Sequence, residues 1–165
     1  MVILNGRHSD SAVMDKIGDI NSGALDWTIM SRLSTGYQHV HRPAQVYPSM
    51  SAGVDVTSGA AWTLGAFAEI VPAGGISTHF DIHWVYVEAL DTNGTYELVL
   101  YKGASGSEEE IGRCRFSRIQ QGDRHFDIPI QVPVLGPNDR ISAALACSTA
   151  SATATLSLYY HDYVL

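Results

Sequence analysis

The stretch HFDIHWVYVEALDTNGTYELVLYKG, residues 79–103, decides the fold predicted for this chain. Residues 79–90 and 95–103 are rich in β-branched and aromatic side chains, which favour strands. Between them lies a short polar segment in which Asn93 and Gly94 readily take the positive φ that a tight hairpin requires. The stretch therefore predicts two long antiparallel strands joined by a turn.

Alternation along the first of these strands predicts which side chains share a face, because successive side chains of a strand point in opposite directions. One face is predicted to hold Phe80, Ile82, Trp84 and Tyr86, and the other Val85, Val87 and Ala89. Since both sets are largely apolar, we expect this strand to be buried on both sides over part of its length.

Shorter segments with the same period of two surround the hairpin. They lie at residues 62–72, 110–119, 125–135, 140–148 and 153–163, with a weaker one at 46–57 that contains Pro48. Turns rich in Gly, Asn, Asp and Pro separate them. About eight short strands with this spacing predict an all-β fold, an antiparallel β-sandwich, and the expected topology is a jelly roll.

The segment 125–135 carries two prolines on one side of its alternation. The residues predicted to face the core are Phe126, Ile128, Ile130, Val132 and Val134. Pro129 and Pro133 fall on the opposite face, and neither can donate a backbone hydrogen bond. We therefore expect an edge strand or an interrupted ladder here.

Residues 1–44 differ from the rest and predict an irregular, partly helical N-terminal arm ahead of a sandwich domain at 45–165. Two short helices are possible, at 9–17 and 23–33, with glycines beside both. One face of the second possible helix holds Leu25, Ile29, Met30 and Leu33. An arm this apolar is expected to dock on its own sandwich, on a sister subunit or on another protein.

Composition argues against several classes of function. The net charge of −7 and the pI near 5.3 disfavour a nucleic-acid partner, since such proteins carry a basic patch. The apolar runs are too short for a membrane helix. The opening MVIL lacks a basic region before it, so we expect no signal peptide and a soluble protein that is not exported. Cys114 and Cys147 are accordingly expected to be buried free thiols.

His79, Asp81 and His83 alternate along the first long strand and therefore point the same way. Imidazole and carboxylate groups in this arrangement are potential ligands of a divalent metal ion. The spacing lacks the His-x-His start of the cupin metal motif, however, and Glu88 falls on the opposite face. We interpret these residues as structural and predict no metal site and no cofactor.

Acid–base and nucleophilic chemistry are not predicted either. Asp81 and Asp127 both occur in the tetrapeptide HFDI, and on neighbouring strands they would make a carboxylate pair of the kind that hydrolyses glycosides. We favour a local role in which each carboxylate accepts bonds from backbone donors where its strand begins. The sequence has no Gly-x-Ser-x-Gly motif and no phosphate-binding glycine loop, so we predict no catalytic residues and no enzyme.

Tyr159, His161 and Tyr163 share one face of the last predicted strand. An exposed set of this kind suits sugar stacking or a protein interface. The alternative is that these side chains belong to the core, or that the arm covers them with Trp27 as a partner. The predicted interface residues are Leu25, Trp27, Ile29, Met30, Leu33, Tyr159, His161 and Tyr163.

Four segments together carry a resemblance to a known family. They are YPSMSAGVDVTSGAAWTLGAFAEIVPA (47–73), HFDIHWVYVEAL (79–90), YELVLYKGASGSEEEIGRCRFSR (96–118) and TATLSLYYHDY (153–163). With these segments the chain resembles small β-sandwich structural proteins of tailed bacteriophage virions, of the decoration or cement type. The resemblance is most specific in YELVLY-G and E-IGR-RFSR and does not extend to the arm.

The resemblance implies a jelly-roll protein that binds the outer face of an assembled capsid shell and stabilises it. Its partner would be the major capsid protein or another virion protein, and the chain would form a homo-oligomer, with a trimer favoured. Such attachment uses many weak contacts whose combined avidity exceeds that of any single contact. A phage tail module, or a receptor- or carbohydrate-binding β-sandwich, is the alternative, and a small enzyme is less favoured than either.

Overall fold

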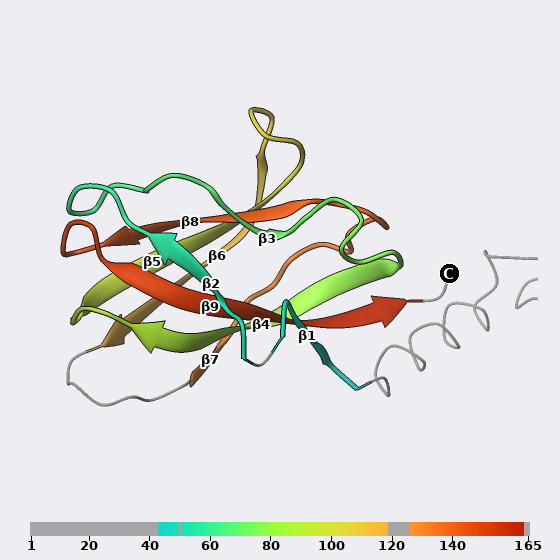
Figure 1. Ribbon diagram of the computed structural model, residues 1–165, viewed down its shortest axis with the longest axis horizontal. Coiled ribbons are helices and arrows are strands. Elements are labelled where there is room, and N and C mark those ends of the chain that lie inside the picture. The colour runs from blue at the N-terminus through green and yellow to red at the C-terminus, as the bar shows by residue number, and fades with distance from the viewer. Residues whose placement is uncertain (1–42, 50, 119–125, 164–165) are drawn as a thin grey trace, which may run out of the picture. The chain divides into compact units, whose positions relative to one another are not determined.

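The computed structural model describes residues 43–49, 51–118 and 126–163, and these form two antiparallel sheets (Figure 1). One sheet contains β1 (Gln45–Tyr47), β2 (Val54–Thr57), β4 (His79–Leu90), β7 (Phe126–Pro129) and β9 (Thr153–Tyr163). The other contains β3 (Ala68–Val71), β5 (Gly94–Lys102), β6 (Glu109–Arg118) and β8 (Ile141–Cys147). We call them the β9 sheet and the β8 sheet. None of the described residues is helical, which confirms the predicted all-β class for this part of the chain.

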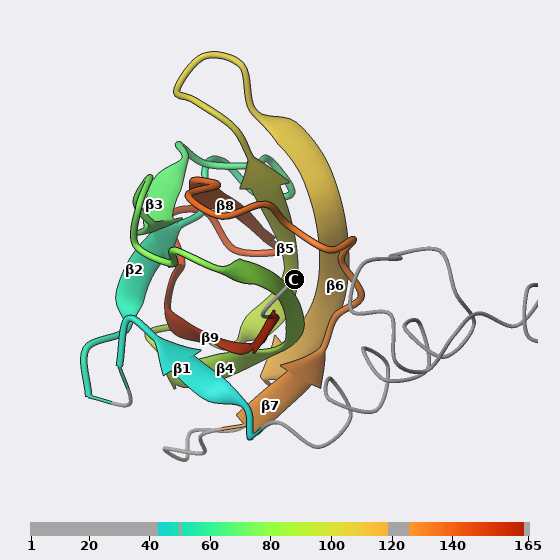
Figure 2. The same cartoon turned by 90° about the vertical axis from the view of Figure 1, so that its right-hand side faces the viewer.

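The two sheets face each other, as the view from the end of the sandwich makes plain (Figure 2). In the β9 sheet the strand order is β1-β9-β4-β7, and β2 also pairs with β9. In the β8 sheet the order is β3-β8-β5-β6. From β2 onward, the chain changes sheet at every connection except the β5–β6 hairpin. Strands that neighbour one another are therefore mostly distant in sequence.

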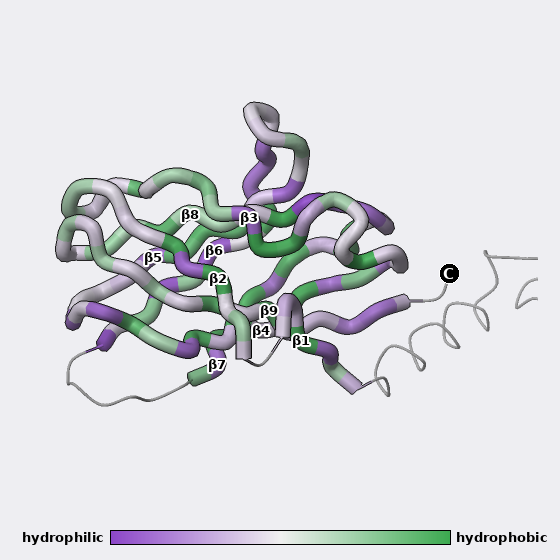
Figure 3. The backbone as a smooth tube through the Cα atoms, viewed as in Figure 1, coloured by the Kyte–Doolittle hydropathy of each residue, from purple (hydrophilic) through white to green (hydrophobic). Residues whose placement is uncertain are grey.

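The core lies between the sheets and draws apolar side chains from both. Phe80, Val85 and Leu156 come from the β9 sheet, Leu98 and Leu145 from the β8 sheet, and all five are inaccessible to solvent. Burying a side chain of this size stabilises the folded state by about 1.5–3 kcal/mol. Figure 3 shows apolar positions recurring along the strands of both sheets. The described residues thus form a β-sandwich around one hydrophobic core.

Tyr96 is the largest fully buried side chain among the described residues, and it lies just after the connection from β4 to β5. The prediction that these two strands form a hairpin was wrong, because β4 and β5 belong to different sheets. Its ring stacks on Phe116, with centroids 5.1 Å apart and an interplanar angle of 5°. Its hydroxyl donates a hydrogen bond to the Thr92 carbonyl at 2.5 Å, so the buried polar atom has an acceptor. Burial raises the pKa of Tyr96 far above that of an exposed tyrosine, because the phenolate would be poorly solvated.

Two β-bulges in β4 overturn the predicted alternation of this strand. Its pairing with β9 shifts register between Ile82 and Trp84 and again between Val87 and Ala89. Each extra residue reverses the phase of the side chains that follow it. Trp84 therefore lies on the outer face with 38% of its surface exposed, whereas Val85 is fully buried.

The prediction that Phe80, Ile82, Trp84 and Tyr86 share a face was consequently wrong. Phe80 and Ile82 do face the core, but they are continued there by Val85 and Val87. Alternation alone cannot reveal such a change of phase, because the bulged residue is defined by the partner strand.

The prolines of segment 125–135 act as expected, since β7 ends at Pro129. Beyond it, the Ile130 N–H donates to the His83 carbonyl at 2.9 Å, and an isolated bridge pairs Phe80 with Leu135. Leu135 is buried, and the prediction that Val134 faces the core was wrong, because 57% of its surface is exposed. Pro133 has no N–H to extend a ladder, so the chain leaves the strand conformation. The inward position passes from Val134 to Leu135.

Both cysteines are free thiols, as predicted. Cys147 lies in the core, and Cys114 is partly buried against it. Burial raises the pKa of the Cys114 thiol to about 11. The predicted N-terminal arm, residues 1–44, lies outside the described residues except for its last two positions.

Candidate functional site

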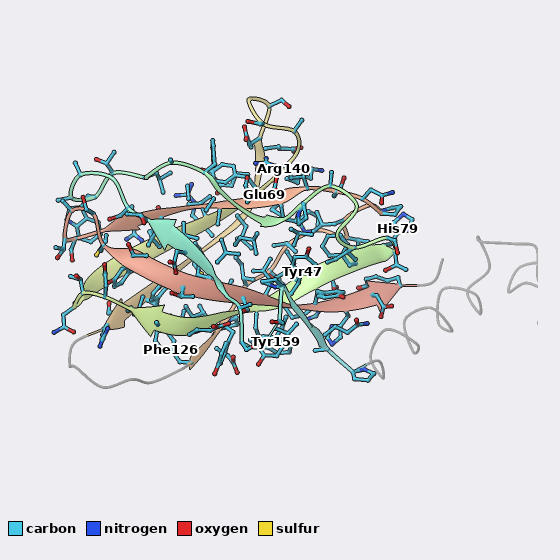
Figure 4. The ribbon with its side chains drawn as sticks, in the orientation of Figure 1. Tyr47, Glu69, His79, Phe126, Arg140 and Tyr159 are labelled. Carbon is cyan, nitrogen blue, oxygen red and sulfur yellow. The ribbon has the colours of Figure 1, made fainter. Side chains whose placement is uncertain are left out.

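The outer face of the β9 sheet gathers the residues that sequence analysis singled out. Tyr160 turns inward and packs its ring against Phe80, with centroids 6.0 Å apart. Its neighbours Tyr159 and His161 therefore point outward, and so does Tyr163. Figure 4 shows Tyr159 on the opposite side of the sandwich from Arg140 and Glu69.

Aromatic rings cover the middle of this face. Tyr86 of β4 and Tyr159 of β9 meet edge to face, with ring centroids 5.9 Å apart and an interplanar angle of 87°. Trp84 lies beside them because the bulge at His83 turned it outward. Pairs of this geometry are favourable beyond the area they bury. Half-exposed rings on a rigid sheet make a surface suited to stacking on a flat ligand or to packing against a protein.

Next to these rings lies a cluster of polar groups, which we call the Asp81 cluster: Asp81, His83, His161 and Tyr163. Asp81 Oδ2 lies 3.0 Å from His83 Nε2, and Asp81 Oδ1 lies 3.8 Å from His161 Nδ1. The Tyr163 hydroxyl donates to Asp81 Oδ2 at 2.5 Å. The two imidazole rings meet with their centroids 4.6 Å apart. One carboxylate therefore stands between two imidazoles and a phenol.

Strand register explains why these groups meet. Asp81 and His161 are direct partners in the ladder between β4 and β9. Such partners have closely spaced side chains on one face. His83 follows Asp81 by two positions and so shares that face, and Tyr163 follows His161 in the same way. Burial, followed by the hydrogen bond to Asp81, raises the pKa of Tyr163 well above its usual value, because the phenolate would be poorly solvated and would lie against the Asp81 carboxylate.

The structure gives a set of potential metal ligands in which His161 takes the place of His79. One carboxylate oxygen and one nitrogen from each of His83 and His161 all lie within 4.8 Å of one another. His79 does not belong to this group; it lies where β4 begins, opposite Tyr163 in the ladder (Figure 4). Asp81 accepts a hydrogen bond from the Tyr163 hydroxyl and lies beside the His83 imidazole, both of them side chains of this face.

Asp127 is remote from this cluster. It stands opposite Tyr86 in the ladder between β4 and β7, whereas Asp81 pairs with His161 on the other side of β4. The two HFDI tetrapeptides therefore do not bring their carboxylates together, and the carboxylate pair considered for acid–base chemistry is not formed.

A second exposed surface was not predicted from the sequence. The connection from β2 to β3 presents Trp62, Leu64 and Phe67, with 58%, 39% and 48% of their surfaces exposed. We call these three residues the apolar loop. Sequence alternation assigned them to a strand at 62–72, but β3 begins only at Ala68. Gly65 was the available sequence signal, and it was interpreted as a bulge within a strand and not as part of an exposed connection.

Backbone hydrogen bonds hold the apolar loop in place. The Trp62 N–H donates to the Cys147 carbonyl at 2.7 Å, and the Gly65 N–H donates to the Leu145 carbonyl at 2.9 Å. Gly65 packs so closely that a Cβ atom there would lie 1.9 Å from the Thr57 carbonyl oxygen. Trp62 has a φ of 63°, a conformation that bulky residues rarely adopt. The loop is thus fixed in a strained shape while its apolar side chains remain exposed.

The outer face of the β8 sheet carries paired charges. Glu97 Oε1 lies 2.9 Å from Arg113, and Glu97 Oε2 lies 2.5 Å from Arg115. Arg113 also contacts Glu110 at 2.7 Å, and that ion pair lowers the pKa of the Glu110 carboxyl. These four side chains therefore pair with one another on the outer face of this sheet.

Arg140 fastens the β5–β6 loop to the sandwich. Its guanidinium contacts Glu69 at 2.5 Å and Glu108 at 3.3 Å, and it donates to the Gly103 carbonyl at 3.1 Å. Burial alone would raise the pKa of Glu108, but hydrogen bonds from its own N–H, from the Gly106 N–H and from Arg140 together hold that pKa below its usual value.

The five arm residues predicted as interface, Leu25, Trp27, Ile29, Met30 and Leu33, lie outside the described residues. The described part of the chain contains no helix long and apolar enough to cross a membrane. A scan against protein-family models finds no match, and a search of curated proteins finds no significant relative.

Proposed function

We propose that this chain is a structural protein of a bacteriophage virion, a decoration or cement protein that binds the outside of the assembled capsid shell and stabilises it. The observation that carries the proposal is the apolar loop. Trp62, Leu64 and Phe67 expose large apolar surfaces on a backbone that two hydrogen bonds tie to β8. Aromatic side chains of this kind are enriched in the centres of protein interfaces. A rigid backbone also lowers the entropy lost on binding.

The proposal includes a jelly-roll topology for the sandwich. It is supported by the strand orders β1-β9-β4-β7, with β2 also beside β9, and β3-β8-β5-β6, in which successive strands from β2 onward alternate between the sheets except at the β5–β6 hairpin. Two sheets connected in this way are typical of jelly rolls, which occur widely among viral capsid domains.

The proposed partner is the major capsid protein or another virion protein, and the proposed assembly is a homo-oligomer, with a trimer favoured. Several copies of the apolar loop in one oligomer would engage neighbouring capsid subunits together, which multiplies weak contacts into avidity. The N-terminal arm would add a further tether. The net charge of −7 suits an outer surface and not a surface in contact with packaged DNA.

The test is binding of the full chain to shells purified without it. The wild-type chain should cosediment with assembled shells and not with free capsid subunits, and proteolysis of intact virions should remove it from their surface. Trp62→Ala should weaken binding by about tenfold or more, the usual loss for an interface aromatic anchor. Arg115→Ala, on the paired-charge face, is the matched control and should bind like wild type.

Failure of the wild-type chain to bind shells, together with its absence from purified virions, would overturn the proposal. Equal binding by the Trp62→Ala and wild-type chains would leave the virion role standing but remove the apolar loop as the attachment surface. Light scattering of the full chain tests the oligomer separately, and a monomer at every concentration would contradict the trimer.

A second candidate function is carbohydrate or receptor recognition by a phage tail module. It is favoured by Trp84, Tyr86 and Tyr159, whose rings lie half-exposed on the outer face of the β9 sheet. Such rings stack on the apolar faces of sugars. Saturable glycan binding that is lost in Trp84→Ala and retained in Trp62→Ala would support this function over shell decoration.

A further inference from the structure

We propose that Asp81, His83 and His161 bind one divalent transition-metal ion, with zinc as the expected metal. The three side chains come from the two central strands of the β9 sheet and present one oxygen and two nitrogens to a common point. The inference concerns a site that neither proposed function requires, so it stands or falls independently of them.

The distances between the donor atoms fit one ion. Two ligands of a tetrahedral zinc ion lie about 3.4 Å apart, since each metal–ligand distance is about 2.1 Å. In the structure, Asp81 Oδ1 lies 3.8 Å from His161 Nδ1, and Asp81 Oδ2 lies 3.0 Å from His83 Nε2. All three donors lie within 4.8 Å of one another. Small rotations of side chains, with no movement of the strands, bring them to ligand spacing.

The kinds of donor select the class of metal. Two imidazoles and one carboxylate suit zinc and its neighbours among the divalent transition metals. Calcium and magnesium prefer sets made only of oxygen ligands, so neither is expected here. His83 Nε2 lies 3.0 Å from Asp81 Oδ2, and metal binding would exchange this contact for two metal–ligand bonds with release of any proton on the ligand nitrogens.

The surroundings of the cluster favour an ordered site. The side chains of Asp81 and His161 are only 12% and 14% exposed, and that of His83 is 35% exposed. Tyr163 donates to Asp81 Oδ2 at 2.5 Å, which orients the carboxylate as an outer-shell partner does in metal proteins. Trp84 stands beside both imidazoles, with its ring centroid 5.4 Å from that of His83 and 6.4 Å from that of His161.

Three protein ligands leave a fourth position of a tetrahedral ion open. The exposure of His83 places that position on the outer face of the β9 sheet and not in the core. The open position would take water or a side chain of a bound molecule, as in zinc sites that keep an exchangeable ligand. The bound ion would also join β4 to β9 at the end of the sheet where both Asp81 and Tyr163 lie.

The experiment titrates the full chain, first treated with a chelator and then dialysed, with zinc chloride in a calorimeter. We expect one ion per chain and a melting temperature that rises with zinc concentration, since a ligand of the folded state stabilises it. Cobalt chloride serves as a second probe, because intense visible absorption of bound Co²⁺ reports a low coordination number.

Matched variants locate the site. His161→Ala and His83→Gln should each weaken zinc binding by at least about 100-fold, and Tyr163→Phe by about tenfold, the effect of losing an outer-shell partner. His79→Ala is the control, since it removes a histidine of the same strand that is not part of the donor group, and its affinity should equal that of wild type.

Absence of zinc and cobalt binding by the folded wild-type chain would overturn the proposal. So would binding that survives both His161→Ala and His83→Gln, because the metal would then lie elsewhere on the chain. His83 is the more exposed ligand, so His83→Gln keeps the test decisive should the His161 variant fail to fold. Shell binding is measured separately and does not enter either outcome.

Discussion

The outer faces of the two sheets use their polar groups in opposite ways. On the β8 sheet, Glu97 is shared by Arg113 and Arg115, and Arg113 also pairs with Glu110, so two carboxylates balance two guanidiniums at the surface. On the β9 sheet, one carboxylate meets two imidazoles and a phenol beside exposed aromatic rings. Paired opposite charges spread over a sheet face keep that surface soluble. Carboxylate and imidazole groups that point to one place can instead bind a ligand together. This contrast is the reason why we propose ligand recognition on the outer face of the β9 sheet and not on that of the β8 sheet.

The largest expected effect separates the two aspartates of the repeated tetrapeptide HFDI. Asp81→Ala should lower the free energy of unfolding by about 2–3 kcal/mol, because the Tyr163 hydroxyl and His83 lose their shared acceptor in a nearly buried place. Asp127→Ala is the matched control at an exposed position and should change it by less than about 0.5 kcal/mol. Denaturant unfolding measures both, and equal losses would contradict the distinction between the two aspartates.

The bulge at His83 gives the next largest effect. Val85→Ala should cost about 2 kcal/mol of unfolding free energy, since Val85 is fully buried. Trp84→Ala, one residue earlier, should cost less than about 1 kcal/mol, because the tryptophan lies on the outer face. The same unfolding experiment decides the phase of the strand, since an unbroken alternation would reverse the order of the two losses.

Alkaline pH should weaken the sandwich. The folded state holds the Cys114 thiol neutral up to a pKa of about 11, against 9.0 for the unperturbed group, and burial raises the pKa of Tyr163 as well. The contribution of Cys114 is therefore complete below about pH 9 and is lost as the pH rises through 9–11, because the unfolded chain releases this proton more readily. The contribution of Tyr163 begins to be lost only above about pH 10, the ordinary tyrosine value.

Tyr163→Phe tests the part played by the β9 sheet. This variant should be less stable than wild type at neutral pH, because it cannot donate to Asp81, yet its stability should fall less steeply above pH 10. Unfolding free energies measured at a series of pH values provide the comparison. Parallel curves for the two proteins would show that Tyr163 does not contribute to the alkaline transition.

The smallest effect is expected on the β8 sheet. Arg115→Ala removes a side chain that is 70% exposed, and its ion pair with Glu97 should contribute less than about 1 kcal/mol. Raising the salt concentration should reduce even this difference, since exposed pairs are screened. A loss as large as that of Asp81→Ala would mean that the two outer faces do not differ as described.

Sequence patterns predicted the fold well where the relevant physics is local. The lengths of β4 and β9 and the end of β7 at Pro129 follow from backbone preferences of the residues concerned. The hairpin predicted at Asn93 and Gly94 is not formed, because β4 and β5 lie in different sheets. The phase of β4 beyond His83 does not follow from such preferences either, because a bulge depends on how the partner strand pairs.

The candidate sites were predictable only in part for the same reason. Asp81 and His83 are close in sequence, and alternation placed them on one face. His161 joins them from a strand that lies far along the chain, and only the register between β4 and β9 reveals it. Exposure of Trp62 was equally hidden, since a tryptophan beside apolar neighbours predicts burial.

The two bulges of β4 also protect the assembly of the sheet against misalignment. Before His83 the inward residues are Phe80 and Ile82, and after it they are Val85 and Val87, so the apolar pattern has two halves out of step. A partner shifted by one residue could match at most one half and would force side chains such as Asp81 into the core. A pairing of β4 with β9 in a shifted register would therefore bury less apolar surface than the native pairing. The two bulges thus favour one register between β4 and β9, and this register brings His161 opposite Asp81.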